Sequence, residues 1–175
     1  MKIIKQYSDL ILYSYERSHD QRGFFQKTFS SEHLQRLKFS LREQYFSVSK
    51  KGVLRGFHFQ TPPYECDKII FCLKGEVLDV VIDLRKKSKT YLKCFSFMLS
   101  EKKAEILFIP KGFGHSFLGI NNENLLVYNT DKVYSEVHDK GILWKSVDFD
   151  WPEKNPNVSE RDKSFINLND FSSPF

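Results

Sequence analysis

The chain has 175 residues, of which 41% are hydrophobic and 28% are charged, so it is long enough to bury one sizeable core. Its aromatic content of 15% excludes a disordered polar chain, and no stretch approaches the roughly 18 consecutive apolar residues of a membrane helix. We therefore expect one folded, soluble domain over residues 1–175 with no membrane partner.

The net charge of +5 at pH 7 suits an anionic partner without naming one. Basic residues are scattered along the sequence, and their densest run, at 85–89, lies between apolar segments in the manner of a solvated turn. We therefore expect no nucleic-acid partner.

Targeting and redox features favour the cytoplasm. Polar residues such as Lys5 and Asp9 interrupt the N-terminal segment, which lacks the apolar core of a signal peptide. Cys66, Cys72 and Cys94 are odd in number and show no C-x-x-C spacing, so we expect them to be reduced.

Short strands dominate the predicted elements. A short amphipathic helix with Ser30 as its N-cap comes first, at 30–37. Apolar, β-rich segments bounded by turn-forming residues then follow from Lys68 onward, at 69–73, 77–82, 91–97, 106–109, 116–120 and 125–128. The tail from Trp151 is rich in Pro, Asn, Asp and Ser, which favours loops with at most short helices. Six such strands without intervening helices indicate an antiparallel sandwich or barrel.

Two histidine motifs stand out. Residues 52–60 read G-x5-H-x-Q and end in His58-Phe-Gln60, and residues 110–115 read P-x-G-x-x-H and end in His115. Together they resemble the two signature segments of the cupin superfamily, which implies an all-β jelly-roll barrel with both histidines at its mouth.

A metal site is the less favoured interpretation of these motifs. Metal-binding cupins carry a second histidine where this chain has Gln60, a poor ligand for a transition metal. Glu65 is the available third ligand beside His58 and His115, while a histidine standing alone is more often a packing residue. We expect no metal and no cofactor.

Six blocks in order between Asp20 and Asp162 resemble the dTDP-4-dehydrorhamnose 3,5-epimerase family. They read DQRGFF at 20–25, GVLRGFHFQ at 52–60, DK at 67–68 with GEVLDVVIDLR at 75–85, IPKGFGH at 109–115, KGILW at 140–144 and VSERD at 158–162. The resemblance implies a nucleotide-diphospho-4-keto-6-deoxy sugar as substrate, in surface polysaccharide synthesis. The ketone acidifies the C–H bonds at C3 and C5, so a base, an acid on the opposite face and a group that stabilises the enolate suffice without a cofactor.

The resemblance also implies four catalytic roles. His58 aligns with the base and Asp162 with the carboxylate that orients it, because a fixed tautomer makes imidazole a better base. Lys68 aligns with the ammonium that faces the enolate oxygen, and Tyr128 with the acid on the opposite face. Without the resemblance, Lys68 reads as a strand-end lysine and Tyr128 as a core aromatic.

Substrate-binding roles are implied in the same way. Guanidinium groups suit a diphosphate, which Arg22 and Arg55 are expected to bind. The remaining expected binding residues are Phe25 at the nucleotide base, His115 near the sugar, and Ser47, Asp139 and Arg161.

Three departures from the family pattern affect the expected substrate. Lys27 replaces a glutamate, Glu43 a glutamine and Tyr45 an asparagine. They alter charge and volume in the binding pocket, so the sequence leaves open a dTDP-linked hexose or a GDP-linked heptose, and inversion at C3 alone or at C3 and C5.

Two alternatives to epimerisation remain at this point: a 4-keto to 3-keto nucleotide-sugar isomerase on the same barrel, and a non-catalytic sugar-binding cupin. The resemblance further implies a homodimer in which N-terminal segments join the partner's sheet, so that Arg22 and Phe25 reach the neighbouring site.

Overall fold

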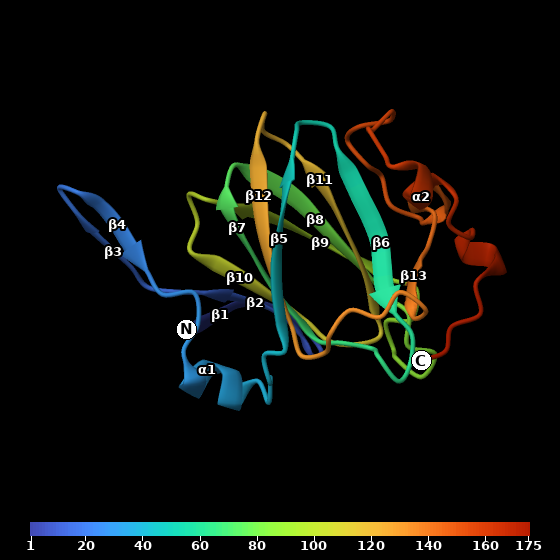
Figure 1. Cartoon of the computed structure of the whole chain (residues 1–175), viewed down its shortest axis with the longest axis horizontal. Helices are drawn as coiled ribbons and strands as arrows, with labels where there is room; N and C mark the ends of the chain where they lie inside the picture. The colour runs from blue at the N-terminus through green and yellow to red at the C-terminus, as the bar shows by residue number, and fades with distance from the viewer.

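The computed structural model describes residues 1–175, and two antiparallel sheets form most of it (Figure 1). One sheet has the order β1-β2-β10-β7-β12-β5, and the other has the order β13-β6-β11-β8-β9. The strands are β1 Lys2–Tyr7, β2 Leu10–Ser14, β3 Arg17–Asp20, β4 Gly23–Gln26, β5 Glu43–Ser49, β6 Leu54–Gln60, β7 Lys68–Lys74, β8 Glu76–Asp83, β9 Cys94–Ser100, β10 Glu105–Ile109, β11 Phe113–Gly119, β12 Asn124–Thr130 and β13 Asp139–Gly141.

The helices are short and lie outside the sheets. They are α1 Ser31–Arg36, α2 Glu160–Lys163, and the 3-10 helices η1 Trp144–Ser146 and η2 Leu168–Asp170. Ser30 caps α1 and accepts a hydrogen bond from the backbone N–H of His33, so the predicted helix and its cap are confirmed. The short helices of the tail are also confirmed. None of the helices has the length and apolar character needed to cross a membrane.

Alternating side chains divide the apolar residues among three clusters. On β8, Val77 and Val81 point between the two sheets, whereas Val80 and Ile82 point outward against the C-terminal tail. The tail from β13 onward covers that outer face, and α1 with the segment that follows it to Phe39 covers the outer face of the other sheet. The all-β jelly-roll barrel expected from the sequence is therefore confirmed, with its core between the sheets.

The predicted strands after Lys68 are present, with two corrections at their ends. The strand expected at 91–97 begins only at Cys94, because Leu92 adopts a φ of 61° and its N–H bonds back to the carbonyl of Asp83 at 2.7 Å in a turn. The strand expected at 116–120 begins earlier, at Phe113. Strands β1 to β6 and β13 were not predicted.

The basic run at 85–89 is only partly a solvated turn. Its lysines are exposed. Arg85 instead pairs with Asp83 at 2.9 Å and Asp9 at 2.6 Å and lies over the ring of Phe113. Arg85 is therefore a structural residue at one end of the barrel.

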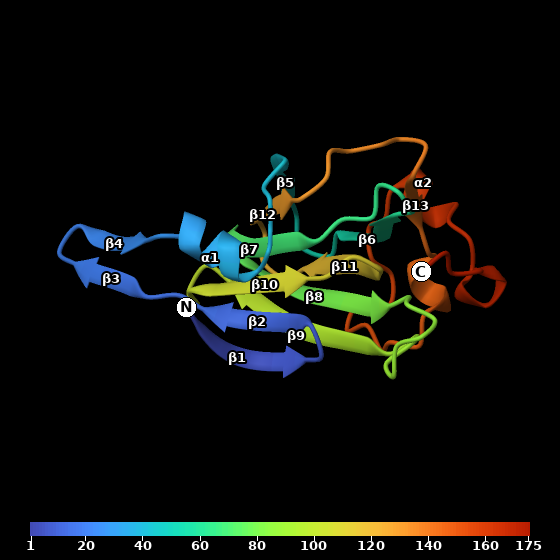
Figure 2. The same cartoon turned by 90° about the horizontal axis from the view of Figure 1, so that it is seen from below.

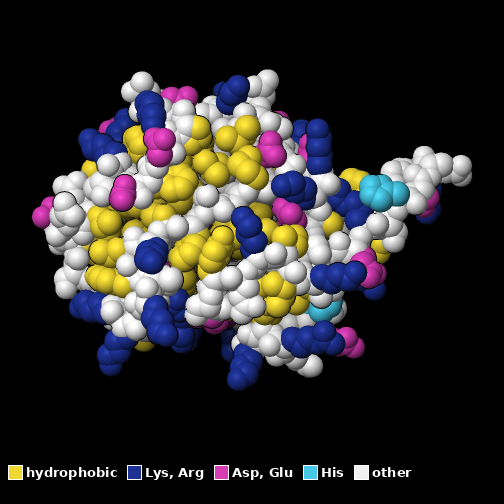
Figure 3. Space-filling view, turned by 180° about the vertical axis from the view of Figure 1, so that it is seen from behind, with side chains coloured by type: hydrophobic (Ala, Val, Ile, Leu, Met, Phe, Trp, Pro, Cys, Tyr) yellow, Lys and Arg dark blue, Asp and Glu magenta, His cyan; other side chains and the backbone are white.

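Strands β3 and β4 form a hairpin that projects away from the barrel, as Figures 1 and 2 show. Phe24 and Phe25 on this hairpin are 58% and 65% exposed. The face of the molecule that is hidden in Figure 1 carries several patches of hydrophobic side chains, with lysines and arginines scattered between them (Figure 3). Within its own chain the hairpin lies against β7, where Phe24 and Phe25 line a pocket with Phe71 and Leu73.

Candidate active site

A bulge in β6 brings Arg55 and His58 to the same side of the sheet. His115 pairs with His58 and Phe117 with Arg55, so two steps along β11 match three along β6. Gly56 lies in this bulge with a φ of 112°, and a Cβ there would lie 2.8 Å from Cα of Ser116. Only glycine fits, which explains the glycine two residues before His58 in the GVLRGFHFQ block.

His58 is paired with Asp162. Its Nε2 lies 2.9 Å from Oδ1 of Asp162, and Oδ2 of that carboxylate accepts the backbone N–H of Gly56 at 2.9 Å. With Nε2–H donating to Asp162, the neutral imidazole keeps a lone pair on Nδ1. The pair therefore presents a basic nitrogen rather than a donor.

The start of α2 fixes Asp162. Ser159 caps this helix and accepts the N–H of Asp162 at 3.1 Å. Burial acts to raise the pKa of Asp162, but hydrogen bonds from His58, Gly56 and Ser159 outweigh it and hold that pKa below its usual range. Asp162 is thus an ionised partner that stabilises a protonated His58.

Lys68 is the first residue of β7 and is 8% exposed, which corrects the alternative of an exposed strand-end lysine. Its Nζ lies 3.4 Å from the carbonyl oxygen of His58, and the two side chains line the same cavity. A buried ammonium beside the imidazole places positive charge where an anionic oxygen would bind.

Tyr128 on β12 lines the same cavity from the sheet that also holds Lys68, opposite the sheet of His58. Its hydroxyl lies 3.1 Å from Oγ of Ser47, and its ring stacks on Tyr45 with a centroid distance of 4.8 Å. Burial raises the pKa of Tyr128 above its ordinary value of 10.0 despite the Ser47 hydrogen bond. The phenol therefore stays protonated and can act as an acid.

A second imidazole–carboxylate pair lies beside the first, and its carboxylate was not predicted. Nε2 of His115 lies 2.7 Å from Oδ2 of Asp79, which is fully buried and whose Oδ1 has no partner. Burial lowers the pKa of His115, although the negative charge of Asp79 opposes this. His115 is therefore neutral, with Nε2–H donating to Asp79 and Nδ1 left as an acceptor.

The cavity that these groups line has a volume of about 200 Å³. Its lining residues are Tyr45, Ser47, Arg55, His58, Lys68, His115, Phe117 and Tyr128. Arg55 donates to Oγ of Ser49 at 3.0 Å and remains exposed at the mouth. Seven of the fourteen side chains predicted for the site thus meet in one cavity.

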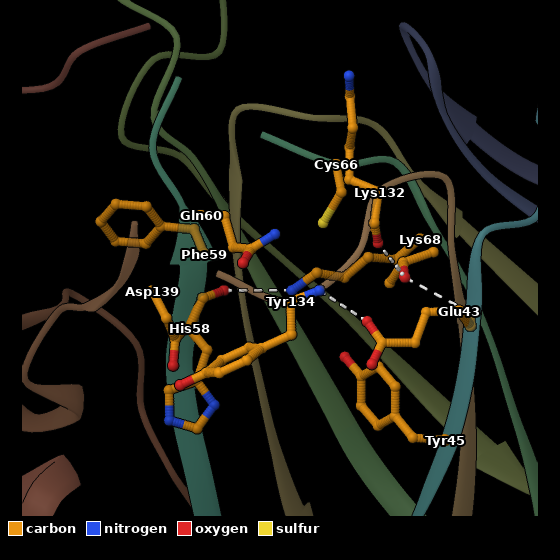
Figure 4. Close-up of a pocket in the computed structure, with 11 residues that line it drawn as sticks. Glu43, Tyr45, His58, Phe59, Gln60, Cys66, Lys68, Lys132, Tyr134 and Asp139 are labelled. Atoms are coloured by element: carbon orange, nitrogen blue, oxygen red, sulfur yellow. Dashed lines mark hydrogen bonds between the residues drawn. The ribbon is translucent and has the colours of Figure 1, made fainter. Parts of the chain in front are cut away.

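A second cavity of about 290 Å³ adjoins the first and shares Tyr45, His58 and Lys68 with it (Figure 4). Glu43 and Asp139 line this second cavity, as the sequence predicted for the site, and Gln60, Cys66, Thr130, Lys132 and Tyr134 are lining residues that the sequence did not indicate. Arg161 lies behind it and forms an ion pair with Asp139.

The loop between β12 and β13 borders the second cavity and is held by side chains of two strands. Glu43 accepts the backbone N–H of Tyr134 at 2.7 Å, and Gln60 accepts that of Ser135 at 2.6 Å and donates to the carbonyl of Val133. The ring of Tyr134 points towards His58 and Asp139 (Figure 4). Gln60 and Glu43 thus have structural partners in this loop.

Three predicted binding residues line neither of the two cavities that contain His58. Arg22 is exposed and pairs with Asp20 at 2.6 Å, Phe25 is on the projecting hairpin, and Lys27 is exposed just beyond it. The hairpin separates these residues from the barrel mouth, so within one chain they do not complete the site.

The fold brings no third metal ligand to His58 and His115. No group of three His, Cys, Asp or Glu side chains is arranged to hold a metal ion. Glu65 lies 3.9 Å from Lys111 instead of joining His58 and His115. The two imidazoles are each engaged by a carboxylate, which suits proton chemistry.

These groups define a class: a jelly-roll barrel whose mouth holds an oriented imidazole, a protonated phenol and a buried ammonium, as acid–base chemistry at an acidic carbon requires. The sequence profile of dTDP-4-dehydrorhamnose 3,5-epimerase matches residues 5–170. The chain belongs to the dTDP-4-dehydrorhamnose 3,5-epimerase family, and it is an isomerase, as its resemblance indicated.

Known relatives match along almost their whole length. The dTDP-4-dehydrorhamnose 3,5-epimerase of Shigella flexneri is 38% identical over 168 residues, which cover 93% of each chain. The crystal structure of the Bacillus anthracis enzyme, with TDP and PPi bound, superposes with a TM-score of 0.91 at 33% identity, covering 95% of this chain and 99% of that one. The Legionella pneumophila enzyme in complex with dTDP-4-keto-L-rhamnose gives a TM-score of 0.90 at 30% identity, with 97% and 93% coverage.

Proposed function

We propose that this protein epimerises a nucleotide-diphospho-4-keto-6-deoxy sugar at C3, or at C3 and C5, without a cofactor. The observation that carries the proposal is the shared cavity of His58, Lys68 and Tyr128, with Asp162 fixed behind His58. A binding module has no use for an oriented base and a protonated phenol in one cavity.

Proton removal is the first step. Nδ1 of His58 takes the proton from the carbon beside the ketone, and the C–H electron pair moves into the ring to give an enolate. Asp162 stabilises the resulting imidazolium through Nε2. The ammonium of Lys68 faces the enolate oxygen, where one preorganised donor typically contributes about 3 kcal/mol.

Reprotonation from the other face completes the inversion. Tyr128 donates its phenolic proton to the carbon, and the enolate collapses back to the ketone. The raised pKa of Tyr128 keeps the phenol protonated until the enolate forms. The 4-keto to 3-keto isomerase alternative requires the carbonyl to move and needs no acid on the opposite face, so it fits this cavity less well.

Asp79 and His115 are assigned to sugar binding in this proposal. The Nε2–H of His115 is committed to Asp79, so Nδ1 is free to accept a hydrogen bond from a sugar hydroxyl. Arg55 at the mouth is assigned to the diphosphate. Asp139, which lines the second cavity, and its ion-pair partner Arg161 are assigned to the nucleotide half of the substrate.

Nucleotide preference is the less defined part of the substrate. The carboxylate of Glu43 accepts a hydrogen bond from the backbone N–H of Tyr134, which partly offsets its negative charge. It therefore repels a diphosphate less than the sequence suggests. Incubation with dTDP-4-keto-6-deoxyglucose and with a GDP-4-keto-6-deoxyheptose, followed by NMR of the products, distinguishes the candidates. Inversion of neither compound, by protein whose fold is verified by circular dichroism, would refute the proposed function.

We further propose a homodimer, in which the projecting β3–β4 hairpin carries Arg22 and Phe25 to the neighbouring site. The exposed Phe24 and Phe25 support this, because large apolar side chains on a projecting hairpin favour a covered surface. Arg22→Ala and His58→Ala subunits, inactive alone, should regain activity when mixed. A fully active monomer in light scattering would contradict the dimer.

Residues 1–175 are proposed to form a single domain, which one cooperative unfolding transition would support. The cytoplasmic location expected from the sequence stays a prediction, and fractionation of the native host tests it.

A further inference from the structure

Strand β5 is an edge strand that contacts Tyr128 through two side chains. In the β5–β12 register Tyr45 is directly opposite Tyr128, and Ser47 is opposite Leu126. The Tyr45 and Tyr128 rings stack with an interplanar angle of 12° and a centroid distance of 4.8 Å. The hydroxyl of Tyr128 lies 3.1 Å from that of Ser47.

These two contacts restrict different motions of the Tyr128 side chain. The Ser47 hydrogen bond fixes the hydroxyl but leaves the ring free to rotate about the axis through that oxygen. A parallel ring against one face prevents this rotation and closes one side of the space around the phenol. Tyr45 is 44% exposed whereas Tyr128 is 7% exposed, so Tyr45 also shields the phenol from solvent.

Tyr45 also lines both cavities, together with His58 and Lys68, whereas Tyr128 lines only the smaller one. A ring that stacks on Tyr128 and borders both cavities is placed to limit movement of the phenol towards the larger one.

We propose that Tyr45 is a positioning residue: it holds Tyr128 in one orientation and so restricts proton delivery to one of the two carbons that flank the ketone. This inference rests on the proposed epimerase function. It assigns to Tyr45 an action through Tyr128, in place of the direct contact with substrate that the sequence implied.

Three variants of β5 test this assignment. Tyr45→Asn removes the stacked ring, whereas Tyr45→Phe keeps the ring and removes only the hydroxyl. Val48→Ala is the matched strand control, because Val48 is 51% exposed and lies outside both cavities. Each variant is incubated with dTDP-4-keto-6-deoxyglucose in D2O, and NMR follows both deuterium incorporation and inversion at C3 and C5.

The parent protein and the Tyr45→Phe and Val48→Ala variants should invert predominantly one of the two carbons. Tyr45→Asn should bring the two carbons towards equal inversion and lower kcat by up to about 10²-fold with a smaller change in KM, because a misplaced acid slows reprotonation. A ratio of inversion at C3 to inversion at C5 that is identical in Tyr45→Asn and the parent, or a Tyr45→Phe variant that behaves as Tyr45→Asn does, would overturn the assignment.

A measurement on the protein without substrate separates this inference from the proposed function. In protein with 13C-labelled tyrosine, the Tyr128 ring resonances are assigned from a Tyr128→Phe sample. They should shift and show faster ring flips in Tyr45→Asn but not in Tyr45→Phe. Unchanged Tyr128 resonances in Tyr45→Asn refute the positioning role. Absence of deuterium from both C3 and C5 in the parent protein refutes the epimerase function.

Discussion

The two imidazole–carboxylate pairs of the barrel mouth contain the same groups in different surroundings. His58 and His115 are directly opposite across β6 and β11, with their carboxylates at 2.9 Å and 2.7 Å. The side chain of His58 is 30% exposed, whereas that of His115 is 6% exposed. Access to the cavity therefore distinguishes the two pairs, since their hydrogen-bond lengths are similar.

Their carboxylates differ as well. Both oxygens of Asp162 accept hydrogen bonds, from His58 and from the backbone of Gly56, whereas Oδ1 of Asp79 is buried without a partner. A fully satisfied carboxylate stabilises an imidazolium when one forms, and a sealed imidazole resists protonation because burial disfavours its charged form. The comparison assigns proton transfer to His58 and neutral hydrogen bonding to His115.

The largest expected effect comes from removing the base. His58→Ala should lower kcat by on the order of 10² to 10⁴ or more, because burial makes His115, the other imidazole of the cavity, a weaker base. Deuterium incorporation from D2O measures this directly. Substantial exchange in His58→Ala would show that the two imidazoles have been assigned the wrong way round.

Removing the orienting charge should have the next largest effect. Asp162→Asn should lower kcat by about 10²-fold, since an amide neither stabilises the imidazolium nor fixes the same tautomer. Steady-state kinetics with a circular dichroism check of folding measures this loss. Near-normal turnover would remove Asp162 from the mechanism.

The matching change in the second pair should be smaller and of another kind. Asp79→Asn should raise KM about 10-fold with little change in kcat, because His115 is assigned to hydrogen bonding in both ground and transition state. A loss of kcat as large as that of Asp162→Asn would mean that both pairs transfer protons.

Acid stability should separate the pairs further. The lowered pKa of His115 means that the unfolded chain binds this proton first, so the free energy of unfolding decreases as pH falls through 6.5. The lowered pKa of Asp162 has the same sign but acts only as pH falls below 3.8. The free energy of unfolding, measured with urea at a series of pH values, should therefore lose its decrease near pH 6.5 in His115→Gln and its decrease below pH 3.8 in Asp162→Asn. Unchanged pH dependence in either variant would contradict these directions.

Removal of metal ions is expected to have no effect. Because Glu65 pairs with Lys111 and leaves two imidazoles without a third ligand, dialysis against a strong chelator should leave activity unchanged. Activity that is lost and then restored by one divalent ion would place both histidines in a coordination sphere.

Strand prediction was successful for the strands from β7 to β12. Segments such as β7 and β8 combine apolar runs with clear turn boundaries, so their sequence indicates strands. Strand β1 is exposed along its whole length, and β6 contains Arg55 and Gly56 in a bulge, so neither shows the pattern of a buried strand. Their pairing depends on contacts distant in sequence.

The site residues that lie in recognisable sequence motifs could be predicted. Motif spacing pointed to His58 and His115, and resemblance pointed to Asp162 and Tyr128. Asp79 was missed because it lies inside an apolar strand and contacts His115 only through the β8–β11 pairing. Strand alternation places it on the inner face with Val77 and Val81, and this was the available signal.

The most direct test of the central claim compares His58→Ala with Tyr128→Phe in D2O with dTDP-4-keto-6-deoxyglucose. If His58 removes the proton and Tyr128 returns one on the opposite face, His58→Ala should incorporate no deuterium, whereas Tyr128→Phe should incorporate deuterium without inverting the carbon. Normal inversion by Tyr128→Phe, or equal loss of deuterium exchange in both variants, would contradict the two-face mechanism.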